Sequence, residues 1–167
     1  MQMKKHGFRI MLVVLIVILA IVSFYMLWVH VPYYQHYHGL DEIRNEICET
    51  NHYEYMDYFT EHRGKDVYYI LKVKINGVLS YVAYDEDKKL VDMYQGTVAD
   101  QETVKKEILK KYPDEVSLDD LVDFDIGYEN DTFVYCVKVQ RNDRLLYIYY
   151  HLDSGRFLKA YRIGSGI

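Results

Sequence analysis

Hydrophobic and polar positions along this chain follow two periods, helical and strand-like, after an opening segment that is apolar throughout. Residues 10–29 carry no charge, and Ser23 is their only clearly polar side chain. Twenty helical residues, at about 1.5 Å of rise each, span a hydrocarbon core of roughly 30 Å. Lys4, Lys5 and Arg9 precede this segment. The positive-inside rule therefore places the N-terminus in the cytoplasm and the remaining chain outside.

The opening segment has two interpretations, an uncleaved anchor and a cleaved signal peptide. The hydrophobic region of a signal peptide is shorter, about 7–15 residues, and ends in a small-x-small cleavage site. Ile21-x-Ser23 matches that site poorly, and residues 24–29 stay apolar beyond it. We therefore expect a single transmembrane helix over residues 10–31, which follows a cytoplasmic N-terminus of residues 1–9 and holds the protein in the cell membrane.

Beyond the anchor, one pattern occurs twice with a constant offset of 66 residues. Residues 67–85 return as residues 133–151. The positions that match include Tyr69 with Tyr135, Lys72 with Lys138, Asn76 with Asn142, and Tyr81 with Tyr147. A repeat of this length exceeds solenoid and propeller periods, and it indicates one small domain in two tandem copies. We place these copies at residues 33–95 and 96–167.

The first copy is predicted to be a helix followed by four strands. Pro32 is expected to end or kink the membrane helix, and residues 33–39 to form a short stretch beside the membrane. Leu40, Ile43 and Ile47 then recur at helical spacing, which predicts an amphipathic helix over residues 40–50. Alternation of apolar and polar residues predicts four strands. One covers residues 52–60, two flank the Asn76-Gly77 hairpin turn, and the last covers residues 90–94.

The second copy repeats this order. Asp100 is a candidate N-cap of a helix whose stripe at helical spacing consists of Val104, Ile108 and Tyr112. Pro113 is expected to end this helix. Ser117-x-x-Asp120 predicts a short capped turn. Strands are predicted at 124–128, 132–141, 144–152 and 156–163, with turns at 129–131, 142–143 and 153–155. Each copy is therefore expected to pack one helix on an antiparallel meander sheet, which makes the fold class α+β.

A two-residue hairpin turn fixes which side chains share a face of each sheet. The expected helix-covered pairs are Ile75 with Val78, Val73 with Ser80, Leu71 with Val82, Tyr69 with Tyr84, Val139 with Leu146, Val137 with Ile148 and Tyr135 with Tyr150. The opposite face is either solvated, with lysine stems lying on tyrosine rings, or a contact surface between the copies or with a partner. The candidate partner surface consists of Tyr68, Ile70, Lys72, Tyr81, Lys138 and Tyr147.

Candidate chemistry is sparse in this sequence. His36-x-His38 lacks further ligands at a familiar spacing, and the pairing of Cys48 with His52 is weak evidence for a nucleophile. Two buried or half-buried thiols are a simpler interpretation of Cys48 and Cys136 than a disulfide. The acidic residues Asp114, Glu115, Asp119, Asp120, Asp123 and Asp125 do not follow a calcium-loop pattern. We therefore expect no enzyme, no catalytic residue, no metal site, no cofactor and no small-molecule substrate.

Charge narrows the possible partners further. Three of the 20 Lys and Arg residues precede residue 10, whereas all 25 Asp and Glu residues follow it. The exported part therefore carries a net charge of −8. Such a surface repels nucleic acid and anionic lipid, so nucleic acid is excluded as an expected partner.

These features together resemble the TseB/YpmB-type membrane proteins of Gram-positive bacteria. The residues that carry the resemblance are Asp66-Val-Tyr-Tyr-Ile and Leu79-Ser-Tyr-Val-Ala-Tyr in the first copy, and Phe133-Val-Tyr-Cys-Val-Lys-Val, Leu146-Tyr-Ile-Tyr-Tyr and Asp153-Ser-Gly-Arg-Phe-Leu in the second. The resemblance covers nearly the whole chain in order and length. It implies that the exported part is a tandem of PepSY-like (cystatin-like) modules.

The resemblance also implies a function. The family suggests a non-enzymatic regulator of cell-wall (peptidoglycan) elongation that binds a class B penicillin-binding protein at the outer membrane face. A PepSY-type inhibitor or chaperone of an exported peptidase is the alternative. The density of tyrosine, 19 residues in the chain, departs from the family pattern and leaves open a surface peculiar to this protein.

Overall fold

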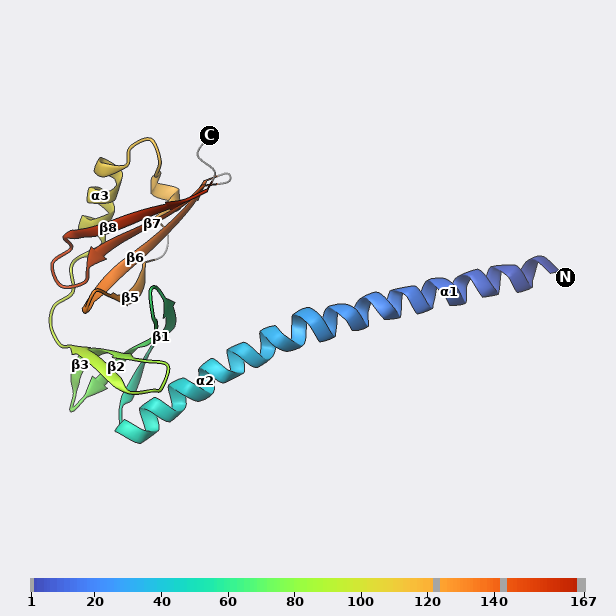
Figure 1. Cartoon of the computed structure of the whole chain (residues 1–167), viewed down its shortest axis with the longest axis horizontal. Helices are drawn as coiled ribbons and strands as arrows, with labels where there is room; N and C mark the ends of the chain where they lie inside the picture. Colours follow the sequence, from blue (N-terminus) through green and yellow to red (C-terminus); the bar gives the residue numbers. More distant parts are fainter. Residues whose placement is uncertain (1, 122–123, 142–143, 165–167) are drawn as a thin grey trace. The chain divides into compact units, whose positions relative to one another are not determined.

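The computed structural model describes residues 2–121, 124–141 and 144–164, and it describes the side chains of these residues except at 2–6, 35–37 and 141 (Figure 1). The chain divides into two compact units, one up to Asn45 and one from Glu46 onward.

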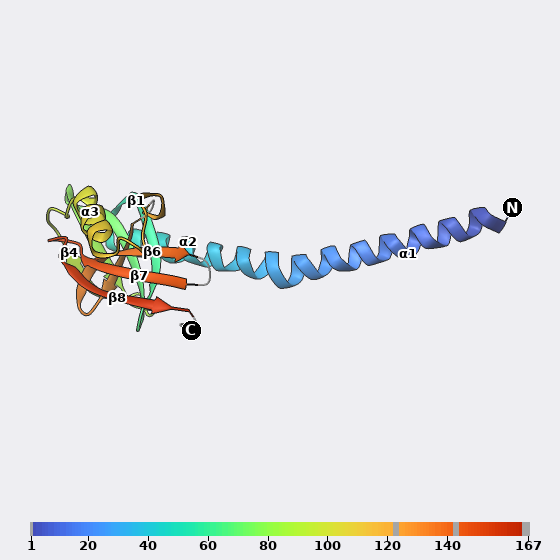
Figure 2. The same ribbon diagram turned by 90° about the horizontal axis from the view of Figure 1, so that it is seen from above.

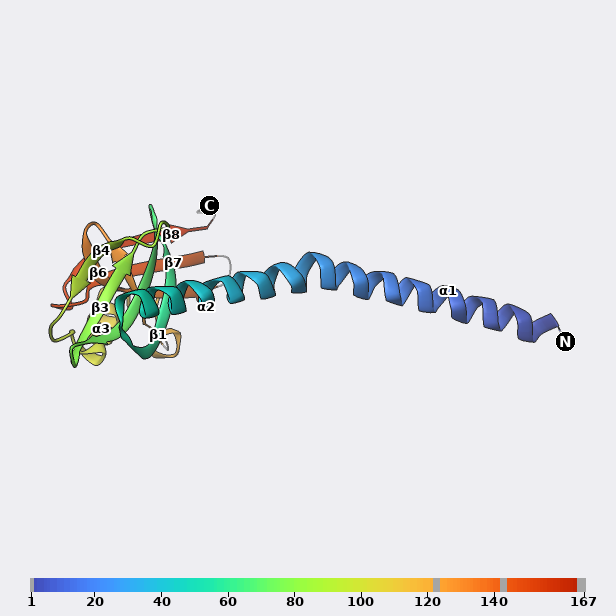
Figure 3. The ribbon, with the colours of Figure 1, turned by 90° about the horizontal axis from the view of Figure 1, so that it is seen from below.

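The first unit is helical throughout its described length. Helix α1 (Gln2–Tyr25) continues into a π-helical turn, η1 (Met26–His30), and then into α2 (Val31–Asn51), as the unbroken ribbon in Figure 3 shows. Of the two outcomes expected at Pro32, an end or a kink of the membrane helix, the end is therefore wrong. Proline lacks the N–H that a regular helix needs, and here the N–H of Val31 bonds to the carbonyl of Met26, five residues back. The wider turn lets the helix continue past Pro32.

The apolar part of this helix has no protein cover. The large hydrophobic side chains from Ile10 to Val29 are exposed. Among the described residues, one helix is long and apolar enough to cross a membrane, and it includes this segment. An exposed apolar surface of this length is unfavourable in water, so the segment is compatible with a membrane anchor.

The second unit begins with the last turn of α2 and a four-stranded antiparallel sheet. Its strands are β1 (Glu54–Arg63), β2 (Val67–Ile75), β3 (Val78–Tyr84) and β4 (Leu90–Tyr94), in the order β1-β2-β3-β4. Asn76 and Gly77 both have positive φ, as the predicted hairpin turn requires. The predicted β2–β3 pairing is confirmed at all four positions, and Lys72 lies opposite Tyr81.

A helix and a second meander follow in the chain. They are α3 (Gln101–Lys111), the 3-10 turn η2 (Leu118–Asp120), β5 (Asp125–Glu129), β6 (Thr132–Arg141), β7 (Arg144–His151) and β8 (Phe157–Ile163). The sheet has the order β5-β6-β7-β8, and Figure 2 shows its last three strands side by side. Lys138 lies opposite Tyr147 as predicted. The predicted turn at Asn142-Asp143 lies outside the described residues.

Local sequence signals explain the start and end of α3 and of η2. The Asp100 carboxylate accepts the backbone N–H of Thr103, which confirms the predicted N-cap. The helix ends at Lys111, two residues before Pro113, because proline cannot continue it. Ser117 and Asp120 form the predicted reciprocal cap of η2.

One hydrophobic cluster joins α3 to both sheets. Val104 and Ile108 of α3 are fully buried. They share the cluster with the predicted helix-covered face of the second sheet, namely Tyr135, Val137, Val139, Leu146, Ile148 and Tyr150. From the first sheet, Ile70, Tyr81 and Ala83 enter the same cluster. The structure is therefore an α+β fold in which two four-stranded sheets share a core.

The first sheet is buried on both faces over much of its area. Its predicted core face is confirmed at Tyr69, Leu71, Val73, Ser80, Val82 and Tyr84, which are all buried. Ile47, from the last turns of α2, is buried as well, and Lys88 pairs with Glu46 of the same turns. Ile75 and Val78 are the exceptions at the hairpin end, because Ile75 is only half-buried and Val78 is half exposed.

Candidate functional site

The six residues of the predicted partner surface do not form one exposed face. Ile70 is fully buried and Tyr81 is only 7% exposed, both inside the shared core. Their expected exposure is therefore wrong, because the second sheet and α3 cover this face of the first sheet. Tyr68 and Lys72 are half-buried, and the Tyr68 ring packs edge-on against Tyr128, with ring centres 5.1 Å apart.

The other two predicted residues lie on the open part of a face of the second sheet, a face that is buried further along at Val134, Cys136 and Tyr149. Lys138 is exposed and Tyr147 is half-buried. This face lies opposite the one that α3 covers, since strand side chains alternate between faces. The two lysine–tyrosine pairs are therefore equivalent in register but differ in environment, and only the second remains available to a partner.

A cluster of charged side chains lies at the edge of this open face. Glu129, at the end of β5, is 7% exposed. Its Oε1 lies 3.1 Å from Nε2 of His62 on β1, and its Oε2 accepts a hydrogen bond from Nζ of Lys159 on β8. Three strands from both sheets therefore supply one buried network, in which each carboxylate oxygen has a nitrogen partner.

Two glycines make room for this network. A Cβ on Gly127 of β5 would lie 2.5 Å from the His62 imidazole, and a Cβ on Gly64 would lie 2.0 Å from Glu129 Oε1. Real Cβ atoms essentially never approach so closely, so the imidazole lies directly on the backbone of β5 at Gly127. Glycine within a strand often marks such a close approach.

The electrostatics of the cluster are those of an ion pair. Burial raises the pKa of the Glu129 carboxyl, but hydrogen bonds from Lys159 and His62 outweigh burial and leave the pKa below its ordinary value. Burial lowers the pKa of Lys159, but hydrogen bonds and charge interactions with Glu129 and Tyr161 together outweigh that effect and leave the pKa raised. At neutral pH Glu129 is therefore negative and Lys159 positive.

Tyrosine rings surround the lysine of this pair. The Lys159 ammonium lies 5.0 Å from the ring centres of both Tyr149 and Tyr161, within the range of cation–π attraction. Tyr161 lies opposite Tyr147 across β7 and β8. The Tyr149 and Tyr161 rings meet edge to face, with centres 6.0 Å apart. The three tyrosines thus form an aromatic surface beside the charged cluster.

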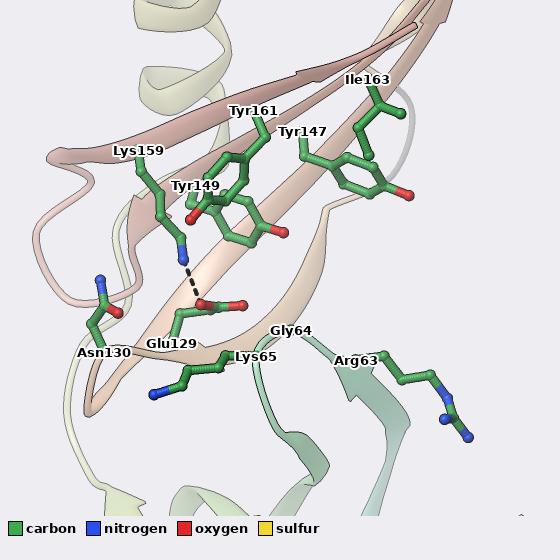
Figure 4. Close-up of a pocket in the computed structure, with 10 residues that line it drawn as sticks. All are labelled: Arg63, Gly64, Lys65, Glu129, Asn130, Tyr147, Tyr149, Lys159, Tyr161 and Ile163. Atoms are coloured by element: carbon green, nitrogen blue, oxygen red, sulfur yellow. Dashed lines mark hydrogen bonds and ion pairs between the residues drawn. The ribbon is translucent and has the colours of Figure 1, made fainter.

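The surface is hollowed into a depression of about 500 Å³. Its lining, shown as sticks in Figure 4, consists of Arg63, Gly64, Lys65, Glu129, Asn130, Tyr147, Tyr149, Lys159, Tyr161 and Ile163. Sequence reasoning identified only Tyr147 among these residues. Gly127, a lone glycine inside a predicted strand, was the one signal that could have pointed to the His62 contact.

The cysteines do not add a nucleophile to this face. Burial raises the pKa of the Cys136 thiol to about 11, so the thiol is protonated at neutral pH. Neither Cys48 nor Cys136 forms a disulfide. Within the described ranges, no group of three or more His, Cys, Asp or Glu side chains is arranged to hold a metal ion. The depression therefore offers aromatic surface and hydrogen-bonding groups.

Comparison with known proteins gives no relative of this chain. No protein-family model, curated protein or solved structure matches it.

Proposed function

We propose that this chain is a membrane-anchored extracytoplasmic binding protein that regulates peptidoglycan elongation by contacting a class B penicillin-binding protein. The proposed membrane anchoring rests on the exposed apolar run from Ile10 to Val29. This run belongs to a helical segment that continues to Asn51. An anchor of this kind keeps a binding module in a thin layer and raises its effective concentration toward other membrane proteins.

The proposed binding role is based on the structure of the second unit. Two meanders with the same strand order and the same lysine–tyrosine register support the proposal that the unit is a tandem of PepSY-like modules. The choice of partner comes from the sequence resemblance to TseB/YpmB-type proteins. Lys138 and Tyr147 remain the candidate contact residues, because they lie on an open face.

Site-specific crosslinking tests this proposal in the full-length protein. A photoreactive residue replaces Tyr147 in one variant and Leu118, which is 63% exposed and lies in η2, in a control variant. We expect crosslinking in native membranes to join the Tyr147 variant to a class B penicillin-binding protein and the Leu118 variant to give far less product. Capture of an exported peptidase instead would favour the inhibitor or chaperone function. Crosslinks to neither class would contradict both functions.

A further inference from the structure

The depression on the second sheet combines a ring-lined wall with a mixed set of polar groups. Tyr147, Tyr149 and Tyr161 supply the aromatic wall, and Ile163 supplies an apolar one. In Figure 4 the tyrosine rings lie together on one side, and Glu129, Asn130 and Lys65 lie on the other. Tyr161 is 51% exposed, so its ring is accessible to a ligand from solvent.

The polar groups are both donors and acceptors. Lys65 and Lys159 donate only, ionised Glu129 accepts only, and the Asn130 amide and the tyrosine hydroxyls do both. Glu129 has one nitrogen partner on each oxygen, while a carboxylate has about four lone-pair sites, so it retains capacity to accept. A ligand with groups that donate and accept at short intervals matches this lining.

The backbone holds these groups in place. Asn130 has a φ of 50° in the tight turn between β5 and β6, and Gly64 lies against Glu129 in the turn between β1 and β2. Glu129 itself is fixed by His62 and Lys159. Such a site is largely formed before a ligand arrives, which lowers the entropy that binding must offset.

Size and chemistry together select a class of ligand. A volume of about 500 Å³ lies within the range of small-molecule sites, roughly 300–1,000 Å³. Hydroxyl groups both donate and accept, and the C–H bonds of a sugar ring, which are slightly positive, favour the negative face of an aromatic ring. We propose that the depression bordered by Glu129, Lys159 and the three tyrosines binds a saccharide.

This site goes beyond the proposed function, because it assigns a small ligand to the chain itself and does not depend on a protein partner. It adds a small-molecule ligand to a chain for which the sequence predicted no small-molecule substrate. An acidic peptide is the competing occupant, since Arg63, Lys65 and Lys159 in the lining are cations. The mixed donor and acceptor lining favours the saccharide, because a carboxylate only accepts and would lie near the negative Glu129.

Methyl NMR of the full-length protein in nanodiscs tests the proposal. Isoleucine methyl groups are labelled, so that Ile163 reports on the depression and fully buried Ile108 serves as an internal reference. The probes are cellobiose, chitobiose and triglutamate, each raised to about 10 mM, well above a millimolar dissociation constant. We expect at least one disaccharide to shift the Ile163 signal in a saturable way and to leave Ile108 unchanged.

Matched variants connect the signal to the site. Tyr161→Ala removes the accessible ring and should weaken disaccharide binding by about fivefold or more. Tyr34→Ala, which removes a similarly exposed tyrosine from α2, should leave the affinity unchanged. The proposal is overturned if neither disaccharide shifts Ile163, if triglutamate alone does so, or if Tyr161→Ala binds as tightly as the wild type while its Ile108 signal shows an intact core.

Discussion

The hydroxyl of Tyr58 on β1 bonds to both backbone polar groups of Ile126 on β5. It accepts the Ile126 N–H at 2.6 Å and donates to the Ile126 carbonyl at 3.3 Å. Strand β5 is an edge of its sheet, and an edge strand presents unpaired N–H and carbonyl groups along its length. Tyr58, from the other sheet, therefore provides a hydrogen-bond partner for the N–H and the carbonyl of Ile126 at this edge, and it joins the two meanders.

The first prediction concerns this junction. Tyr58→Phe keeps the ring but leaves the Ile126 N–H and carbonyl without their partner, which should lower the free energy of unfolding by about 1–3 kcal/mol. Urea denaturation of the full-length protein, followed by circular dichroism, measures the change. Tyr147→Phe, which removes a hydroxyl on the open face, serves as the control. An unchanged midpoint for Tyr58→Phe would show that the hydroxyl does not stabilise the junction.

The second prediction concerns the pH dependence of Glu129. Its pKa is lowered in the folded state, so its contribution to stability is present above the ordinary value of about 4.5. That contribution is lost as the pH falls through the lower folded value. Glu129→Gln should cost about 3 kcal/mol at pH 7, because Lys159 loses its charged partner, and the difference from the wild type should shrink at acid pH.

An exposed ion pair provides the control for this experiment. Glu115 forms a two-pronged pair with Arg162, and both side chains are well exposed. Glu115→Gln should cost at most about 1 kcal/mol at pH 7, since water screens the pair. If Glu129→Gln were as mild as Glu115→Gln, the buried network would not contribute to folding.

The third prediction tests the close packing of His62 on Gly127. Gly127→Ala places a Cβ 2.5 Å from the imidazole and should destabilise the protein by about 2–3 kcal/mol. The double variant of His62→Ala with Gly127→Ala should cost less than the sum of the two single changes, because without the imidazole the new Cβ has nothing to clash with. Gly39→Ala is the control, since a Cβ there meets nothing within 4 Å. Strict additivity of the two changes would contradict the contact.

Hairpins and caps could be predicted from sequence because each depends on a few adjacent residues. Asn76-Gly77 fixes the β2–β3 register through its two positive φ values, and Asp100 fixes the start of α3 through one side chain. The duplicated pattern then placed the second meander by analogy. These signals are local, and tertiary context did not change them.

The junction between the sheets could not be predicted, because it depends on which face meets which. Ile70 and Leu71 are adjacent and both fully buried, so neither face of β2 is open at this point. Such a continuous apolar run is the signature of a strand buried on both faces. The alternation rule left the second of these faces open, either as a solvated face or as a contact surface between the copies or with a partner. The structure shows the contact between the sheets at Ile70 and Tyr81. The contacts of His62 with Glu129 join positions 67 residues apart, and no local pattern encodes them.

The fourth prediction concerns membrane topology. The starting variant lacks both native cysteines, Cys48 and Cys136, and one new cysteine replaces either Lys4 or Leu118. Intact cells that carry each variant are treated with a maleimide that cannot cross membranes. If the basic residues before the apolar run stay in the cytoplasm, Leu118→Cys should react and Lys4→Cys should react only after lysis. Labelling of Lys4→Cys on intact cells would reverse the proposed orientation, and labelling of neither would place the second unit inside.

The last prediction separates two tyrosines that the repeat makes equivalent. Tyr81 and Tyr147 lie opposite Lys72 and Lys138 at the same register, yet Tyr81 lies in the shared core and Tyr147 on the open face. Tyr81→Ser should therefore cost about 3–5 kcal/mol, because it leaves a cavity that the core cannot fill. Tyr147→Ser should cost less than about 1.5 kcal/mol, because water reaches the position it vacates.

Urea denaturation of the two full-length variants measures this difference, and co-purification with the membrane partner gives the second readout. Tyr147→Ser should reduce partner recovery while the protein stays folded, whereas Tyr81→Ser should reduce it only in proportion to the protein lost to unfolding. Equal unfolding costs would mean that the two copies present this face to the same environment, and the shared core would then be wrong. Full recovery of the partner with Tyr147→Ser would remove this tyrosine from the binding surface.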